Sequence, residues 1–395
     1  MALDLEQKYA RLFAYCKTKD FAGPDPFDGL NSRIFQATPL KHSRVARLAF
    51  LQAVKRSRVN LRPLLLVPEG VNPKALALIA LAEMSRYRVT RSPRHRANAE
   101  ELSDRLLAMA IKGEFNGSRT SAFGYNFDWQ SRAFYIPIGI PAIVPTAFAL
   151  RALVEAHQEF GADKYFEIAA EIGVFIVNCL NRPVENEDEI CFSYTPVDHS
   201  VIYNASLLAG ECLATVGELI GSNEYLDLAA KTVRFVVGRQ RDDGAWVYGE
   251  KPSQAWADNF HTAYILLSLA RISGKVSGLD VETADAITRG VDYWADNFFL
   301  DDGTPKYYDN QTDPVDIHSA AAAIVALSEL KDLDGRLLPL ADKVAAWTCE
   351  NMLDDKGYFY YRRMKNRVVK TPFMRWGQAW MAYALSRLME AQVSK

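Results

Sequence analysis

Apolar residues recur along most of this chain with the period of an α-helix. The first strong signal begins at Asn72 and Pro73, a helix start with proline in the first turn, and continues as the apolar run KALALIALAEM. Small residues crowd 204–210 and 319–323, which predicts closely packed inner helices, whereas 224–239 has the polar face of an outer helix. After the helix that begins at 72, we expect helices near 97–112, 145–160, 163–180, 201–220, 224–239, 258–273, 281–297, 316–330, 337–352 and 375–390.

The connections between these helices repeat one kind of turn, which begins with an acidic residue and continues into aromatic residues. Such turns begin at Asp188, Asp242, Asp301 and Asp354, at steps of 54, 59 and 53 residues. In three of them a glycine follows, and glycine accepts the positive φ that such turns require. A step in the mid-fifties fits one helical hairpin plus a long loop. The prediction is an all-α fold, a single closed (α/α)6 toroid with its loops gathered over one mouth.

The N-terminal residues lie outside this repeat. We expect 1–65 to form a helical extension that packs on the toroid, and 66–395 to form the toroid itself, since no linker rich in Gly, Pro or Ser separates two domains. The pattern leaves one inner helix unpaired at the C-terminus. We expect a helix over 41–58 to pair with it and to close the ring.

The predicted helix over 41–58 is strongly basic. Its basic face has two interpretations: it docks on an anionic glycan or a membrane surface, or it is the solvated face of a packed helix. Its basic residues are Lys41, Arg44, Arg47, Lys55, Arg56 and Arg58.

Composition narrows the class of protein. A net charge of −2 with well-mixed signs disfavours nucleic acid as a partner. The five scattered cysteines form no CxxC pair and are typical of free thiols in a reducing compartment. Neither a signal-peptide pattern nor an apolar run of membrane-spanning length is present, so we expect a cytoplasmic protein. Aromatic residues make up 11% of the chain, more than packing usually requires, and favour an oligo- or polysaccharide substrate.

The stretch 240–262, QRDDGAWVYGEKPSQAWADNFHT, holds the densest set of chemically active side chains. Glycosidic hydrolysis needs a carboxylic acid and a second carboxylate. Asp258, flanked by aromatic residues at a helix start, is the favoured acid/base, with helix N-capping as its structural alternative. Asp128 in a non-helical loop is the best second carboxylate, followed by Glu250 and Asp316.

Proton abstraction from a uronic acid, as in C5-epimerisation or β-elimination, is the alternative chemistry. It needs a base, an acid, and groups that neutralise the sugar carboxylate. His261 could be the base; His318 occupies a matching helix start. The acid could be Tyr194, Tyr248 or Tyr308, and the carboxylate could be bound by Asn204 or Asn259 with Arg132 or Arg375.

Further residues are expected to bind substrate rather than to react. They are the aromatic side chains of Trp129, Trp246, Trp256, Tyr360 and Trp376, together with Gln378. No phosphate-binding glycine motif or compact cluster of metal ligands is present, so we expect neither a cofactor nor a metal. A non-catalytic glycan-binding protein remains the third alternative.

Two short motifs resemble known families. Trp256-Ala-Asp258-Asn259 at a helix start and Arg375-Trp-Gly-Gln378-Ala-Trp380 are similar to segments of unsaturated glucuronyl hydrolases, in the six-hairpin glycosidase superfamily. This resemblance implies a general acid/base role for Asp258. The chain departs from those hydrolases at Phe260 and His261.

Two other segments resemble glucuronyl C5-epimerases. They are Tyr194-Thr-Pro196 followed by the helix at Asn204, and the aromatic loop that contains Trp129 and Arg132. The whole sequence also resembles proteins encoded with bacterial polysaccharide-biosynthesis genes. Together these resemblances imply an enzyme of uronic-acid-containing glycans, and cleavage of a glycosidic bond is the favoured reaction.

Overall fold

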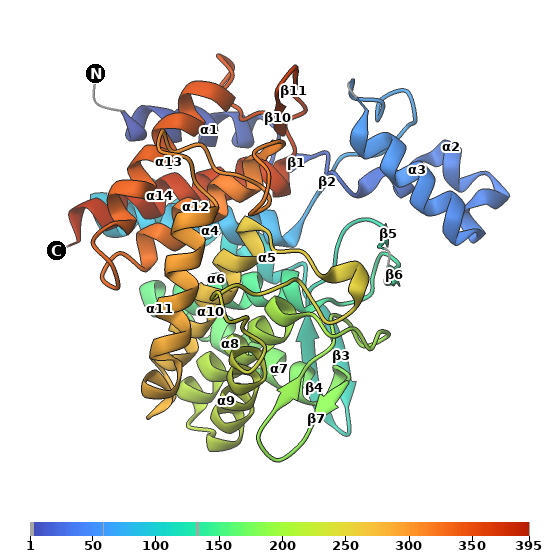
Figure 1. Ribbon diagram of the computed structural model, residues 1–395. Coiled ribbons are helices and arrows are strands. Elements are labelled where there is room, and N and C mark those ends of the chain that lie inside the picture. Colours follow the sequence, from blue (N-terminus) through green and yellow to red (C-terminus); the bar gives the residue numbers. More distant parts are fainter. Residues whose placement is uncertain (1–3, 58, 132–133, 395) are drawn as a thin grey trace.

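The predicted toroid is present. The structure, a computed structural model, describes residues 4–57, 59–131 and 134–394. Within these residues, six inner helices contact one another in chain order, and the last contacts the first, which closes an (α/α)6 ring (Figure 1). The inner helices are α4 (Pro73–Thr90), α6 (Ile143–Phe160), α8 (Tyr203–Ile220), α10 (Asn259–Ser273), α12 (Ile317–Glu329) and α14 (Ala379–Val393).

An outer helix packs against each inner helix. Five of the outer helices directly follow their inner partners and form hairpins with them. They are α5 (Pro93–Leu107), α7 (Asp163–Cys179), α9 (Asn223–Val237), α11 (Leu279–Asn297) and α13 (Leu337–Met352).

The sixth outer position is filled by α1 (Leu5–Thr18), which packs on α14. The repeated turns show that α1 occupies the same kind of position as the other outer helices. Gly303 has φ +88° and its Cα faces the backbone of Lys343 on α13, and Gly357, also at φ +88°, faces the backbone of Arg11 on α1 in the same way. The prediction that the 41–58 helix closes the ring is therefore wrong, because α1 takes that place.

The predicted basic helix forms part of a separate N-terminal module, which we define as residues 27–57. It comprises the 3-10 turns η1 (Asp28–Asn31) and η2 (Pro39–His42) and the helices α2 (Arg33–Gln36) and α3 (Arg44–Arg56). Leu30, Phe35 and Leu51 form a small core of its own. In Figure 1 the module projects sideways from the ring, next to the β5–β6 hairpin, and α3 contacts β5.

The strands are short and belong to the connections. All pair antiparallel, and β10 lies between β9 and β11. Their bounds are β1 (Ala22–Gly23), β2 (Gly70–Val71), β3 (Ile111–Phe115), β4 (Ser118–Ala122), β5 (Trp129–Gln130), β6 (Tyr135–Ile136), β7 (Val184–Glu185), β8 (Ile190–Cys191), β9 (Val315–Asp316), β10 (Arg362–Met364) and β11 (Arg367–Val369). A 3-10 turn, η3 (Pro252–Gln254), precedes α10, and a π-helical turn, η4 (Met374–Gln378), leads into α14.

The two ends of the ring differ in chemistry. Towards the C-terminal ends of the inner helices, Glu211 accepts hydrogen bonds from Arg151 and Arg271, and Arg271 also pairs with Glu329. The N-terminal ends of the inner helices line the main cavity instead, so the mouth lies at that end. Within the described chain, no helix combines the length and the apolar character needed to cross a membrane.

Candidate active site

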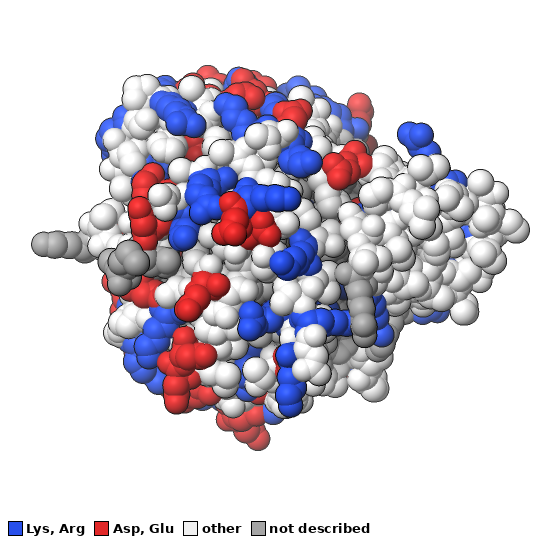
Figure 2. Space-filling view, turned by 90° about the horizontal axis from the view of Figure 1, so that it is seen from above, with Lys and Arg blue, Asp and Glu red and all other residues white. Residues whose placement is uncertain are grey.

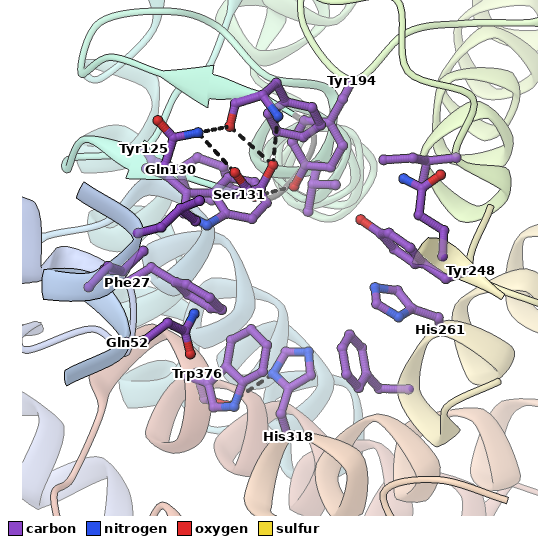
Figure 3. A pocket seen from close by; sticks show the side chains of 18 of the residues that line it. Phe27, Gln52, Tyr125, Gln130, Ser131, Tyr194, Tyr248, His261, His318 and Trp376 are labelled. Carbon is purple, nitrogen blue, oxygen red and sulfur yellow. Dashed lines mark hydrogen bonds between the residues drawn. The ribbon is translucent and has the colours of Figure 1, made fainter. Parts of the chain in front are cut away.

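A cavity of about 840 Å³ opens where the inner helices begin. All six inner helices contribute to it, because residues in the first turn of each helix, or directly before it, line the cavity. Figure 3 shows His261 and Tyr248 on one wall, His318 and Trp376 on the next, and Tyr125 and Tyr194 across the space. The predicted site residues that line this cavity are Trp129, Tyr194, Asn204, Tyr248, Trp256, His261, His318, Arg375 and Trp376.

His261 is held by the residue that caps its helix. Asp258 is the N-cap of α10: its Oδ1 accepts a hydrogen bond from the backbone N–H of His261 at 3.0 Å, and its Oδ2 lies 2.6 Å from Nδ1 of the same residue. A carboxylate accepts, so Nδ1 carries a proton, and in the neutral imidazole Nε2 carries the lone pair. The side chain of His261 is 19% exposed, and the ring centroid of Tyr248 lies 4.5 Å away. The dyad therefore presents a basic nitrogen to the cavity.

His318 belongs to a second hydrogen-bonded chain. Its Nδ1 lies 3.0 Å from the carbonyl oxygen of Trp376, which only accepts, so Nε2 accepts the hydrogen bond from the Tyr264 hydroxyl at 2.8 Å. The ring stacks on Trp376 with centroids 4.1 Å apart. Burial, together with the nearby Lys74, holds the pKa of His318 well below its ordinary value. His318 is therefore neutral and fixes the orientation of Tyr264.

Lys74 completes this chain, and its side chain is buried, which is unusual for a lysine. It lies in the first turn of α4, is 2% exposed, and its Nζ donates to the Tyr264 hydroxyl at 3.2 Å. Nζ also lies 4.1 Å from the ring centroid of Phe148 and 5.1 Å from that of Trp380. No ion pair joins Lys74 to a carboxylate of the described residues. Burial therefore holds the pKa of Lys74 well below its ordinary value.

Hydrogen-bonding groups on the opposite wall are only partly satisfied. The hydroxyls of Tyr125 and Tyr194 lie 2.6 Å apart. Asn204, in the first turn of α8, is 4% exposed and lines the cavity, and no described group donates a hydrogen bond to its Oδ1. Since a buried polar atom without a partner is costly, this amide is suited to a ligand.

Arg375 is a structural cation at the cavity wall. Its Nε and one terminal nitrogen donate to the two carboxylate oxygens of Asp25 at 2.6 and 2.8 Å, and both side chains are buried. The guanidinium lies 5.3 Å from the ring centroid of Tyr125. This pair ties the loop before the N-terminal module to the start of α14.

Aromatic rings supply flat apolar surface around these polar groups. Tyr248 stacks on Trp256 with centroids 5.0 Å apart and an interplanar angle of 13°. Trp129 makes edge contacts with Phe27 and Phe134 at 5.6 and 5.5 Å. Such surfaces suit the C–H faces of sugar rings, with a few polar groups setting orientation.

The four predicted acidic residues do not line the cavity. Asp258 faces the backbone and ring of His261, as described above, and accepts a hydrogen bond from Nε1 of Trp256 at 3.1 Å. Asp128 accepts from the backbone N–H of Ile138 at 2.8 Å and from the Tyr135 hydroxyl at 3.1 Å. Asp316 caps α12, accepts from Trp376 Nε1 at 2.8 Å and pairs with Arg362, whereas Glu250 is exposed and pairs with Arg239. Each carboxylate thus already has protein partners.

Five further predicted binding residues do not line the cavity. Trp246 donates through Nε1 to the carbonyl of Val236, and Asn259 bridges the carbonyl of Lys306 and Nε1 of Trp294. Gln378 makes two 2.8 Å hydrogen bonds to the backbone of Phe359. The Tyr360 hydroxyl donates to Asp354, and the backbone of Tyr308 bridges that of Asp258. Arg132, the remaining predicted residue, lies outside the described residues.

Sequence reasoning missed two residues of the polar chain. Lys74 was hidden in an apolar run, where a single lysine in a first turn is the signal that could have marked it. Tyr264 lies one turn after His261 and so faces the same side of α10. Among the described residues, no three His, Cys, Asp or Glu side chains come together as metal ligands would.

Comparisons with known proteins support the fold. No protein-family model matches the chain, and no curated protein matches it. A cellobiose 2-epimerase from Bacillus thermoamylovorans is similar, with a TM-score of 0.62, 11% identity and coverage of 82% of this chain and 88% of that one. An unsaturated glucuronyl hydrolase specific for heparin has a TM-score of 0.60 at 12% identity, with 82% and 88% covered. A polysaccharide lyase has a TM-score of 0.61 at 9% identity, with 99% and 98% covered. At these identities the likeness establishes the (α/α)6 toroid, which the chain shares with all three.

Proposed function

We propose that this protein is a carbohydrate-active enzyme that removes and returns the C5 proton of a uronic acid residue in a glycan. The observation that carries the proposal is the Asp258–His261 dyad facing a cavity lined by cations and tyrosines but, among the described residues, by no carboxylate. Hydrolysis by the predicted Asp258 and Asp128 pair is less well supported, because such carboxylates must reach both sides of the glycosidic bond. Two of the similar structures are an unsaturated glucuronyl hydrolase specific for heparin and a polysaccharide lyase, and their names support a glycan substrate.

His261 is the proposed base. The C5–H of a uronic acid lies next to the carboxyl carbon, so the electron pair left by the proton spreads onto the carboxylate. Nε2 of His261 takes the proton, and the Asp258 carboxylate stabilises the imidazolium that forms. In this proposal Asp258 is a positioning residue, whereas its sequence context predicts an acid/base.

Charge on the sugar carboxylate must be offset for this step to occur. Lys74 supplies a buried ammonium, and the unpaired Oδ1 of Asn204 accepts a hydrogen bond from a hydroxyl of the same sugar. An anion beside Lys74 favours its charged form, and a buried attraction of this kind is stronger than one in water. The proton returns to the opposite face of C5 from the Tyr264 hydroxyl, which turns from His318 towards the substrate. Lys74 then donates a proton to the tyrosinate through their 3.2 Å hydrogen bond. The proton taken up by His261 leaves to solvent, from which Lys74 is protonated again.

Elimination is the second candidate, favoured by the likeness to a polysaccharide lyase over nearly the whole chain. It shares the first step. The same carbanion then expels the sugar joined at O4 and leaves a C4–C5 double bond, while a tyrosine such as Tyr194 donates a proton to the leaving oxygen.

Incubation with uronic acid oligosaccharides in deuterated water tests the proposal. NMR reads deuterium at C5 and the configuration there, and mass spectrometry reads chain length. Deuterium at C5 without cleavage, lost in His261→Asn, supports epimerisation, and unsaturated ends support elimination. Saturated new reducing ends would instead support hydrolysis, and binding without any reaction would support a glycan-binding protein.

A further inference from the structure

Basic side chains border the outer part of the cavity as well as its floor. Arg44 and Arg56, on α3 of the N-terminal module, line the same cavity as Lys251, which precedes η3. Between 29 and 68 the sequence contains no Asp or Glu. In Figure 2 the outer part of the lobe on the right, formed by this module, shows white and blue atoms. The opening therefore attracts anions from the inner floor to the rim.

α3 has two different faces. Leu51 and Val54 are buried against the module. Val45, Leu48, Ala49 and Gln52 follow the helical spacing of one face and line the cavity, yet Val45 is 75% exposed. This face is therefore open to solvent at the rim and borders the route by which a ligand enters. A helix that extends along a cavity in this way adds binding surface beyond one sugar ring.

We propose that α3 forms outer subsites for an acidic oligosaccharide, in which Arg44, Arg56 and Lys251 bind a second anionic sugar while the reacting uronate lies near Lys74. The position of the reacting sugar rests on the proposed function; the rim subsites rest on the cationic lining and the open face of α3. The ligand is thus a chain with at least two acidic residues. A monosaccharide or a neutral disaccharide binds only near Lys74 and makes no ionic contact with the rim.

A membrane surface is the competing occupant for a basic helix. The observations favour the glycan, because the basic ends of α3 line a cavity that is continuous with the tyrosine and histidine walls. A bilayer contacts a flat surface and cannot follow side chains into such a cavity. The exposed Val45 fits either occupant, so the test includes vesicles.

Binding is measured by quenching of tryptophan fluorescence, since Trp129, Trp256 and Trp376 line the cavity. The probes are galacturonate and heparosan tetrasaccharides, their carboxyl-reduced forms and the monosaccharides. The variant is Arg44→Gln/Arg56→Gln, and the matched control is Arg33→Gln, an exposed arginine of the same module outside the cavity.

We expect the double variant to weaken binding of an acidic tetrasaccharide by about tenfold, at about three- to fivefold for each exposed charge. Binding of the carboxyl-reduced form and of the monosaccharide should change less than about twofold, and the control should leave all three unchanged. Added salt should weaken tetrasaccharide binding less in the variant than in the wild type.

Equal losses for acidic and reduced probes, no loss at all, or no binding of any acidic tetrasaccharide would overturn the proposal. So would binding to phosphatidylglycerol vesicles that Arg44→Gln/Arg56→Gln abolishes while tetrasaccharide binding persists unchanged. Because the experiment measures binding and not reaction, it separates the rim subsites from the proposed reaction at C5. Selective binding without C5 exchange would contradict the proposed reaction and leave the rim subsites standing.

Discussion

Oδ2 of Asp258 lies 2.6 Å from Nδ1 of His261, three residues further along the chain, while Oδ1 of the same carboxylate caps the helix on which His261 lies. One side chain thus fixes both the backbone and the imidazole. In the proposed reaction, His261 at this helix start is the base, and Asp258 sets its tautomer.

Replacing His261 tests the base directly. His261→Asn removes the basic nitrogen, and we expect the rate of C5 exchange to fall by about 10²–10⁴-fold with little change in tetrasaccharide binding. His42→Asn, at an exposed site outside the cavity, is the control. Single-turnover exchange measured by NMR gives the rate, and an unchanged rate in His261→Asn would remove this residue from the mechanism.

Asp258→Asn separates the two roles of the carboxylate. Asparagine caps helices about as well as aspartate, and the loss of the hydrogen bond from Trp256 Nε1 should lower the free energy of unfolding by about 1–3 kcal/mol, so the protein stays folded. The exchange rate should nevertheless fall by about 10²-fold or more, because the amide neither fixes the tautomer nor stabilises imidazolium. Asp4→Asn, which changes the N-cap of α1, is matched for capping and should keep full activity. Equal activity of both variants contradicts the dyad.

Because Lys74 is buried, we expect the stability of the protein to depend on pH. Burial puts its folded-state pKa below that of the unfolded chain, so the unfolded chain binds more protons and stability rises with pH towards the ordinary lysine pKa. Lys74→Met lacks this cost and should be more stable near neutral pH by about 1–3 kcal/mol, with the gain shrinking towards about pH 10. Urea unfolding at several pH values measures it, with the exposed Lys19→Met as control. If the stability gained by Lys74→Met grew with pH, the prediction would be contradicted.

The predictable part of the fold came from features that repeat. The acidic turns at Asp242, Asp301 and Asp354 mark hairpins because each turn meets the next outer helix in the same way. Which N-terminal helix closes the ring could not be predicted, since α1 and α3 are both amphipathic and periodicity does not name a partner. Tertiary packing decided between them.

The residues that line the cavity were predicted in part, for a related reason. Aromatic residues and histidines next to helix starts do face the mouth, as His261, His318 and Trp376 show. Acidic residues at the same helix starts do not, because an aspartate there satisfies backbone N–H groups, as Asp258 and Asp316 do. The sequence gives the position of a carboxylate along the chain but not whether its side chain points into the cavity or towards the backbone.

The buried pair of Asp25 and Arg375 should matter for stability. Asp25→Asn leaves a buried guanidinium without its anion, and we expect a loss of about 3–5 kcal/mol. Asp20→Asn, which breaks the exposed pair with Arg105, should cost less than about 1 kcal/mol. Urea unfolding compares the two variants. A loss for Asp25→Asn no larger than for Asp20→Asn would show that this pair does not anchor the loop.

Close helix packing makes another prediction. A Cβ at Gly210 on α8 would lie 2.0 Å from Oγ1 of Thr232 on α9. Gly210→Ala should therefore destabilise the protein by about 1–3 kcal/mol, although alanine is the better helix former. At Gly335 a Cβ meets no atom within 4 Å, so Gly335→Ala should be neutral or slightly stabilising. Thermal unfolding compares them, and stabilisation by Gly210→Ala would contradict the packing.

The most direct test of the central claim is deuterium incorporation at C5 of an acidic tetrasaccharide in deuterated water. We predict incorporation by the wild type, with inversion or a C4–C5 double bond, and none by His261→Asn. Saturated reducing ends without deuterium at C5 would contradict the account and return the chemistry to glycosidic hydrolysis.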